Sequence, residues 1–229
     1  IRKKALKEQN RPFLFLRLGN THNFLYIWEL RNNTKIMDTD RKWVVVRIDG
    51  KIAAVSTDYR LLAAISATIA QQKSPAYNEI RVETVDLPYV WELRNTVTWN
   101  DLLLFGTDFQ KKVWRKLFGL REEARPPHLI SYSDFADLCQ NKAGVRAVAH
   151  AIGLNPVSVI IPCHLVIPKE SIDKIAAIQK RAEATIFKGD DLCMKSILDN
   201  NSIDFGEYAL GKRLKRELIK MELEQSINP

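Results

Sequence analysis

The spacing of apolar residues changes near the middle of this chain, and that change limits the folds it can adopt. In the first half, β-prone runs at residues 43–48 and 51–56 flank Asp49-Gly50, a pair that suits a type I′ hairpin turn. In the second half, apolar residues recur at helical spacing behind capping residues. The sequence therefore predicts an α+β protein, with a small α/β domain at residues 1–101 and a helical domain at residues 102–229.

Further elements are expected in the first domain. Residues 13–18 and 80–85 have the pattern of strands, and residues 59–72 have apolar side chains at helical spacing. One heptapeptide pattern, Tyr-x-Trp-Glu-Leu-Arg-Asn, occurs at both 26–32 and 89–95. A single echo of this length is too short for a repeat architecture, and it indicates no function by itself.

The second domain opens with two capping boxes. Thr107 with Gln110, and Ser131 with Asp134, each place a hydroxyl three residues before a side chain that can complete the cap. The first box precedes an apolar stripe of Phe109, Val113, Trp114 and Leu117. The second opens a helix to about Leu138, which is followed by a turn at 141–144 and a helix at 145–152. Two short helices joined by a tight turn form a helix-turn-helix pattern, which many helical proteins also contain without binding DNA.

A buried β-prone run, Val157–Ile161, leads to Pro162, Cys163 and His164. Pro162 favours an extended residue before it, so the run is expected to be a strand that presents Cys163 at its end. A cysteine beside a base is a candidate nucleophile, because the thiolate is the reactive species. Neighbouring side chains on an extended chain point to opposite faces, so Cys163 and His164 need a bend or a bridging water to interact. The alternative is a structural cysteine beside an incidental histidine.

Composition narrows the function classes. The chain is 46% hydrophobic and 27% charged, with a net charge of +8. This excludes low-complexity and collagen-like chains, and the positive charge permits a polyanionic partner. No apolar run is long enough for a membrane span, and the basic N-terminus lacks the apolar stretch of a secretory signal. Three scattered cysteines without a CxxC pair predict neither a disulfide framework nor a metal site, and they favour the nucleus or cytoplasm.

The motifs as a set are more specific than any one of them. They comprise Gly106-Thr-Asp-Phe-Gln-Lys-Lys-Val-Trp114, Ile130-Ser-Tyr132, Val145-Arg-Ala-Val148, Asn155-Pro156 and Ile160-Ile-Pro-Cys-His164, followed by Tyr208-Ala-Leu-Gly211, Lys215, Leu218 and Glu222. In this order and spacing the chain resembles the O6-alkylguanine-DNA alkyltransferases. The resemblance runs without a break from about Gly106 to Val166.

The resemblance implies a fold and an activity. The fold would be a ribonuclease-H-like N-terminal α/β domain followed by a helical domain with a winged-helix-type helix-turn-helix. The activity would be DNA repair by irreversible transfer of the alkyl group from O6-methylguanine, and less well from O4-methylthymine, to Cys163. Each protein molecule would act once, as a monomer and without a cofactor or metal, on double-stranded DNA bound through the minor groove.

The resemblance also implies roles for individual residues. Cys163 would accept the alkyl group, His164 would deprotonate it through a water, and Glu222 would orient His164. Asn155 would hold the turn before the nucleophile, and Tyr132 would donate a proton toward the departing base. Arg146 would fill the gap left by a flipped nucleotide, with Ala147, Ala151 and Gly153 allowing close approach to DNA, although these small residues also suit core packing. Tyr208, Ala209 and Lys215 would lie at the substrate pocket.

The chain departs from the family pattern at three places. Leu165 replaces the usual arginine after Cys-His, Ala209 replaces a frequent serine, and an insertion occupies about residues 168–207. Within the insertion, residues 171–187 have the pattern of an amphipathic helix. Two other functions stay open at this point: a non-catalytic lesion sensor that recruits repair factors, and a thiol hydrolase that uses Cys163 and His164.

Overall fold

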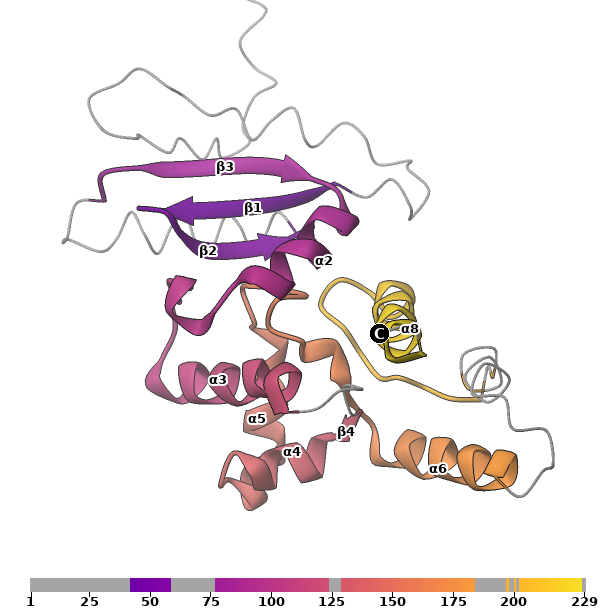
Figure 1. The fold of residues 1–229 in the computed structure, drawn as a ribbon. Helices are drawn as coiled ribbons and strands as arrows, with labels where there is room; N and C mark the ends of the chain where they lie inside the picture. Colours follow the sequence, from indigo (N-terminus) through magenta and orange to yellow (C-terminus); the bar gives the residue numbers. More distant parts are fainter. Residues whose placement is uncertain are drawn as a thin grey trace, which may run out of the picture.

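The computed structural model describes residues 42–58, 77–123, 129–183, 197, 200 and 202–227. Within these ranges the protein mixes strands and helices, with a small sheet at one end and helices at the other (Figure 1). The expected strand at 13–18, the helix at 59–72 and the heptapeptide at 26–32 lie outside the described residues. No helix in the described part of the chain is both long and apolar enough to cross a membrane.

The sheet has three antiparallel strands in the order β2-β1-β3. Strands β1 (Trp43–Ile48) and β2 (Lys51–Ser56) form the expected hairpin, and β3 (Ile80–Val85) pairs with the other edge of β1. Asp49 and Gly50 have φ angles of 47° and 81°, as a type I′ turn requires at both central residues. The three strand predictions in this region are therefore confirmed.

Helix α2 (Leu87–Thr96) follows the sheet and was not predicted. The Asp86 carboxylate caps its first turn by accepting a hydrogen bond from the Tyr89 amide at 3.0 Å. The helix buries Val90, Trp91 and Arg94, and it contains the second copy of the repeated heptapeptide. A short 3-10 helix, η3 (Trp99–Asp101), connects it to the helical half.

Helix α3 (Asp108–Glu123) begins at the predicted capping box. The Thr107 amide donates to Gln110 Oε1 at 2.8 Å, and the Gln110 amide donates to Thr107 Oγ1 at 3.2 Å. The expected stripe is confirmed except at its first position, where Phe109, in the first turn of the helix, is 38% exposed. The buried members are Val113, Trp114 and Leu117.

Two short helices and a tight turn follow, as predicted. Helix α4 (Tyr132–Leu138) is capped by Ser131, whose hydroxyl accepts from the Asp134 amide at 3.1 Å. The 3-10 helix η4 (Lys142–Gly144) leads into α5 (Val145–Gly153). The Trp114 indole N–H donates to the Ala151 carbonyl at 2.8 Å, and this buried bond fixes α5 against α3.

The predicted strand at Val157–Ile161 is wrong. Val159 has a φ of 73°, in the left-handed region, and the Ile160 amide bonds to the Ser158 carbonyl at 2.9 Å, which closes a γ-turn. A β-branched residue in this conformation is strained, so the surrounding contacts must hold it. The expectation failed because the β-propensity of Val and Ile reflects burial as much as backbone conformation, and here all of 157–161 is buried in a tight loop.

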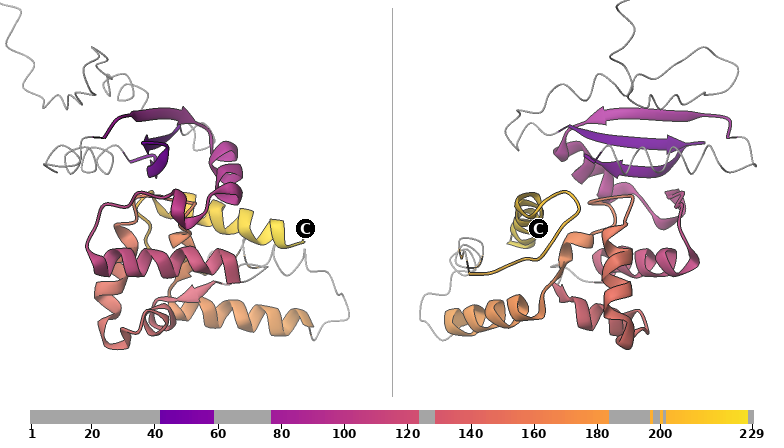
Figure 2. Two further views of the ribbon diagram at one scale, coloured as in Figure 1. Left: turned by 60° about the vertical axis from the view of Figure 1, so that its left-hand side comes forward. Right: turned by 180° about the vertical axis from the view of Figure 1, so that it is seen from behind.

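The insertion contributes a helix and a separate apolar cluster. Helix α6 (Lys169–Glu183) confirms the predicted helix over the described residues, with Ile175 buried. It lies at the far end of the molecule from the sheet (Figures 1 and 2). Its cluster reaches the C-terminal helix α8 (Lys212–Ile227) through Ile219 and Leu223. The insertion thus packs against α8 through a small apolar cluster of its own.

A larger cluster of buried side chains joins the sheet to the helices. It includes Trp43 and Val45 from β1, Trp114 from α3, Phe135 from α4 and Leu218 from α8. A minimal parallel pair, β4 (Ile130–Ser131) with β5 (Val166–Ile167), lies between the helices. The site loop described below therefore sits where the two halves of the chain share one core.

Candidate active site

The loop before Cys163 is held from two directions. From the sheet, the Val55 amide donates to the Pro156 carbonyl and the Ser158 amide donates to the Val55 carbonyl, each at 2.9 Å. From within the loop, the buried Asn155 side chain bonds to backbone on both sides. Its Oδ1 accepts from the Val157 amide at 3.0 Å, and its Nδ2 donates to the Ile161 carbonyl at 2.9 Å. These bonds hold the strained turn at Val159.

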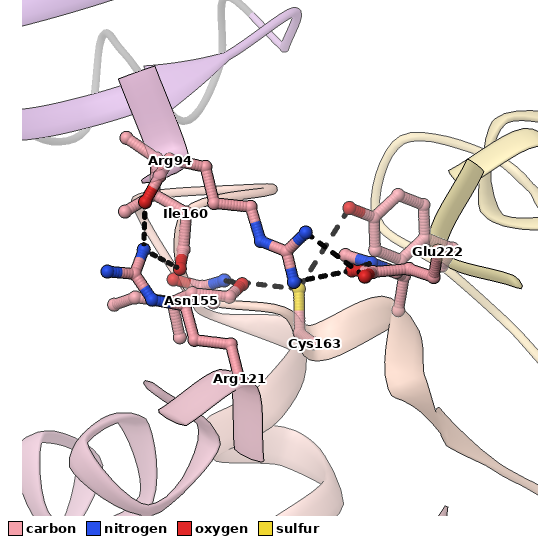
Figure 3. Close-up of polar contacts among 9 residues, drawn as sticks. Arg94, Arg121, Asn155, Ile160, Cys163 and Glu222 are labelled. Carbon is pink, nitrogen blue, oxygen red and sulfur yellow. Dashed lines mark hydrogen bonds and ion pairs between the residues drawn. The ribbon is translucent and has the colours of Figure 1, made fainter. Parts of the chain in front are cut away.

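The sequence predicted that Cys163 lies at the end of a strand, and this prediction is wrong. Cys163 is the first residue of the 3-10 helix η5 (Cys163–Leu165), directly after Pro162. The Cys163 amide bonds to the Ile161 carbonyl at 2.8 Å, so the chain turns at Pro162 instead of continuing extended. The Cys163 sulfur accepts a hydrogen bond from Asn155 Nδ2 at 3.1 Å and lies 4.0 Å from the Tyr208 hydroxyl oxygen (Figure 3).

The resting Cys163 is a thiol. Its side chain is buried, and burial raises the pKa of this thiol although the Asn155 and Tyr208 hydrogen bonds and the charge of Lys215 act in the opposite direction. Burial outweighs the charge of Lys215, which by itself favours a thiolate. A nucleophile at this position must therefore lose its proton as part of the reaction, so a base is needed nearby.

His164 is placed to be that base. Its imidazole is fully buried, and Nε2 lies 2.8 Å from Glu222 Oε1. Burial lowers the pKa of His164 in spite of the hydrogen bond to Glu222, so the ring is neutral at rest. Its Nδ1 atom is buried and has no hydrogen-bond partner in the described part of the chain. A neutral ring bonded at Nε2 offers a lone pair at Nδ1 for a proton.

Glu222 joins His164 to a residue that sequence reasoning missed. Arg94 Nη1 donates to Glu222 Oε2 at 3.0 Å, and Arg94 Nη2 lies 2.7 Å from Oε1 (Figure 3). Both side chains are almost fully buried, and 128 positions separate them in the sequence. The one available signal was the repeated heptapeptide, whose second copy contains Arg94.

A pocket of about 380 Å³ opens beside the Cys163 sulfur. Of the residues expected near the substrate, Tyr132, Tyr208 and Ala209 line it, together with Gly153 and Asn155. The wall also includes Ala149, Ile152, Ser158 and Glu207. The sulfur is thus accessible from a cavity, while the base behind it is enclosed.

Lys215 was expected at the substrate pocket, but it is not among the residues that line it. Lys215 is buried, donates to the Val166 carbonyl at 2.7 Å, and lies 5.7 Å from the centroid of the Tyr132 ring. Burial lowers the pKa of Lys215 to about 8, although the charges of Cys163, Asp204 and Glu207 oppose the shift. On α5, Arg146, Ala147 and Gly153 are exposed.

Ala151 differs from the other small residues predicted to lie near DNA. Its side chain is buried, and its carbonyl accepts the bond from Trp114. The small residues of α5 therefore divide between a packing role at Ala151 and an exposed face at Ala147 and Gly153.

The central part of the chain is similar to a known protein family. A family model described as "6-O-methylguanine DNA methyltransferase, DNA binding domain" matches residues 108–184. The matched residues contain α4, α5 and the loop that carries Asn155, Cys163 and His164, together with α3.

Relatives of this part of the chain include proteins of a virus, a yeast and a bacterium. A probable methylated-DNA–protein-cysteine methyltransferase of Acanthamoeba polyphaga mimivirus is 44% identical over 72 residues, which is 31% of this chain and 45% of that protein. The inducible methylated-DNA–protein-cysteine methyltransferase of Bacillus subtilis is 47% identical over 64 residues, which is 28% of this chain and 34% of that protein. The chain thus spans less than half the length of these curated relatives.

Among solved structures, the O6-methylguanine-DNA methyltransferase of Pyrococcus kodakaraensis has a TM-score of 0.44 and 21% identity, covering 82% of this chain and 95% of that one. The Mycobacterium tuberculosis O6-methylguanine methyltransferase has a TM-score of 0.42 and 20% identity, covering 76% and 82%.

Leu165, which follows Cys163 and His164, gives a test of stability. Its side chain is fully buried, so Leu165→Arg would place a guanidinium in the protein interior. We expect a loss of several kcal/mol in the free energy of unfolding, about the effective cost of burying an ion. Leu165→Met, which conserves volume, should cost less than about 1.5 kcal/mol. Urea unfolding of both variants measures this, and an arginine variant as stable as wild type would contradict it.

Proposed function

We propose that this protein repairs alkylated DNA by transferring the alkyl group from O6-methylguanine, and less well from O4-methylthymine, to Cys163. The observation that carries the proposal is the position of the Cys163 sulfur, which faces a pocket and receives a hydrogen bond from Asn155. The adjacent His164 and Glu222 supply the base and its orienting carboxylate. The family match over residues 108–184 supports the same reaction.

The chemistry follows the nucleophile–base–orienter arrangement. A water between the two side chains would carry the Cys163 proton to His164 Nδ1, and the resulting imidazolium would be balanced by Glu222. The sulfur then attacks the methyl carbon, the bond from that carbon to O6 breaks, and a thioether forms. Asn155 Nδ2 donates to the developing thiolate, which offsets the cost of a buried negative charge.

The departing guanine needs a proton, because it leaves with the electron pair of the broken bond. Tyr132 lines the pocket and is the proposed donor toward the base. Burial raises the pKa of Tyr132, so its hydroxyl keeps its proton until the base leaves. The Lys215 ammonium beside the Tyr132 ring would stabilise the phenolate that forms. Displacing a thiolate from an unactivated methyl group is slow, so one molecule would repair one lesion.

DNA would be bound through its minor groove by α5. A base inside a duplex cannot reach a sulfur at the bottom of a pocket, so the nucleotide must be flipped out. Arg146 is exposed on α5 and is the proposed residue that fills the vacated space, while Ala147 and Gly153 would allow close approach. In this proposal α4 and α5 form a winged-helix-type helix-turn-helix, residues 1–101 form a ribonuclease-H-like domain, residues 102–229 form the alkyltransferase domain, and the protein acts as a monomer.

Arg146→Ala tests the DNA-binding part of the proposal. The side chain is exposed, so we expect the free energy of unfolding to stay close to that of wild type. Single-turnover methyl transfer from duplex DNA should fall by about tenfold or more, since flipping costs a few kcal/mol that the inserted side chain offsets. Arg181→Ala on α6 is the matched control, because it removes an exposed arginine from the insertion. Equal transfer rates for Arg146→Ala and wild type would exclude the insertion role.

The decisive experiment uses duplex DNA with a labelled methyl group on O6 of one guanine. We expect the label to move to the tryptic peptide that contains Cys163, with one methyl group per protein molecule. Tight lesion binding without label transfer would instead indicate a lesion sensor. Repeated turnover on ester or amide substrates, without label transfer, would indicate a thiol hydrolase.

A further inference from the structure

Arg94 comes from the first half of the chain, yet its guanidinium binds the Glu222 carboxylate, which in turn contacts the proposed base His164. It contacts both oxygens of Glu222, at 3.0 Å to Oε2 and 2.7 Å to Oε1. Glu222 Oε1 is also the atom that His164 Nε2 approaches to 2.8 Å. The buried carboxylate is thus shared between the guanidinium and the imidazole.

The position of Arg94 is itself fixed. Arg121, from α3, donates through Nη1 to the Arg94 carbonyl at 2.5 Å. Arg121 also bonds to the Val97 carbonyl. It reaches the Ile160 carbonyl in the site loop at 3.5 Å (Figure 3). The Arg94 guanidinium lies 4.8 Å from the centroid of the Trp91 ring. Arg121 therefore ties the C-terminal end of α2 to the loop that presents Cys163.

A guanidinium at this place has an electrostatic consequence. Glu222 is 2% exposed, and a carboxylate at that depth tends to take up a proton unless it is paired. Burial opposes ionisation of Glu222, but the hydrogen bond and charge of His164, together with the charge and hydrogen bonds of Arg94, hold its pKa below the usual value. Glu222 thus remains a carboxylate, which can only accept hydrogen bonds.

The charge state of Glu222 decides the tautomer of His164. Against a carboxylate, the neutral imidazole must carry its hydrogen on Nε2, which leaves the lone pair on Nδ1. Against a protonated Glu222, the ring could accept at Nε2 and carry its hydrogen on Nδ1, and no base would face the thiol. The buried Nδ1 has no partner among the described residues, as a free lone pair awaiting a water-borne proton would require.

We propose that Arg94 is a positioning residue for alkyl transfer: it keeps Glu222 ionised and so holds His164 in the tautomer whose Nδ1 accepts the Cys163 proton. The role in catalysis rests on the proposed function, whereas the tautomer is a property of the protein alone. Arg94 is not among the residues that line the pocket and it bonds to Glu222, so it acts through Glu222 and His164.

The first measurement needs no DNA. Imidazole nitrogen NMR of the full chain, labelled with ¹⁵N-histidine, reports which ring nitrogen of His164 carries hydrogen. In wild type we expect the Nε2–H form between about pH 6 and about pH 8, and in Arg94→Gln a substantial Nδ1–H population. Arg94→Lys keeps the positive charge and should keep the wild-type tautomer. Arg81→Gln, an exposed arginine of β3, is the matched control.

The second measurement is single-turnover methyl transfer across the same pH range. At neutral pH, Arg94→Gln should be about ten- to a hundredfold slower than wild type, the usual effect of removing a group that orients a functional residue from behind. Without the Arg94 charge, the pKa of Glu222 should be higher in this variant than in wild type. The rate of the variant should therefore fall further as the pH is lowered and Glu222 takes up a proton, whereas the wild-type rate stays flat over the same interval. Arg94→Lys should lose less than Arg94→Gln, and Arg81→Gln should match wild type.

These outcomes separate the two proposals. An Nδ1–H tautomer in wild type, or an unchanged tautomer and pH profile in Arg94→Gln, would overturn the role of Arg94. If Arg94→Gln does not fold, the wild-type spectrum and the Arg94→Lys variant still decide the matter, since loss of the Nε2–H tautomer with the charge retained would also overturn it. Absence of methyl transfer by wild type, with the expected tautomers, would reject the proposed function and leave the electrostatic role intact.

Discussion

Cys163→Ser is expected to abolish methyl transfer while preserving lesion binding. The substitution keeps a small polar side chain that can accept the hydrogen bond from Asn155, so the strained loop before it should be retained. A serine hydroxyl is much less acidic than a thiol, and the His164 ring is a weak base because burial lowers its pKa. The hydroxyl would therefore stay protonated and would not attack the methyl carbon.

Two assays check the Cys163→Ser expectation. Labelled transfer to protein should fall below detection, and a fluorescence-anisotropy titration with duplex DNA containing O6-methylguanine should give an affinity close to that of wild type. Cys139→Ser is the control, since Cys139 is a buried cysteine at the end of α4 and does not line the pocket. Residual transfer in Cys163→Ser, or its loss in a folded Cys139→Ser, would assign the acceptor to another residue.

Glu222→Gln is expected to impair both reaction and stability. Without the carboxylate, neither tautomer of His164 is enforced and the imidazolium has no counter-charge. A comparable wrong-tautomer substitution in a catalytic triad lowers the rate about ten-thousandfold, and we expect a loss of roughly a thousandfold or more here. The substitution also leaves the buried Arg94 guanidinium without its partner, which should cost about 3 to 5 kcal/mol of unfolding free energy.

Glu217→Gln provides the matched control for Glu222→Gln. Glu217 lies on the same helix and pairs with Arg213 one turn away, but both side chains are well exposed to solvent. Its transfer rate and unfolding free energy should stay close to wild type, because exposed pairs of this kind contribute little. Urea unfolding and single-turnover transfer measure both effects. A Glu222→Gln variant as fast and as stable as Glu217→Gln would contradict the proposed charge network.

The features predicted correctly from sequence are those encoded by neighbouring residues. The Asp49-Gly50 turn and the Thr107 capping box need only a few adjacent side chains, and both form as expected. Ser131 caps α4 as expected, but Asp134 accepts a bond from the Ser131 hydroxyl at 2.6 Å instead of completing the box. Helix α2 had local signals of its own, Asp86 as a cap and a proline in the first turn, but its apolar pattern was too weak to suggest a helix.

The features that sequence reasoning missed depend on distant contacts. The turn at Val159 is stable because Asn155 and strand β2 hold its flanks, so β-propensity alone gave the wrong structure. The pairing of Arg94 with Glu222 joins residues 128 positions apart, and no local pattern announces it. The motif residues around Cys163 were recognisable because they are close together in the chain. Arg94, which pairs with Glu222, is far from them in the sequence and was not recognised.

The backbone hydrogen bonds that join Val55 to Pro156 and Ser158 have an evolutionary consequence. Together with Arg94, they make the reactive loop a joint product of both halves of the polypeptide. Recombination that exchanged one half for that of a distant homologue would disturb these hydrogen bonds. It would also leave the charge of Arg94 or Glu222 buried without its partner. Substitutions at Arg94 and Glu222 should consequently be inherited as coupled pairs, and the two halves should share a single phylogeny.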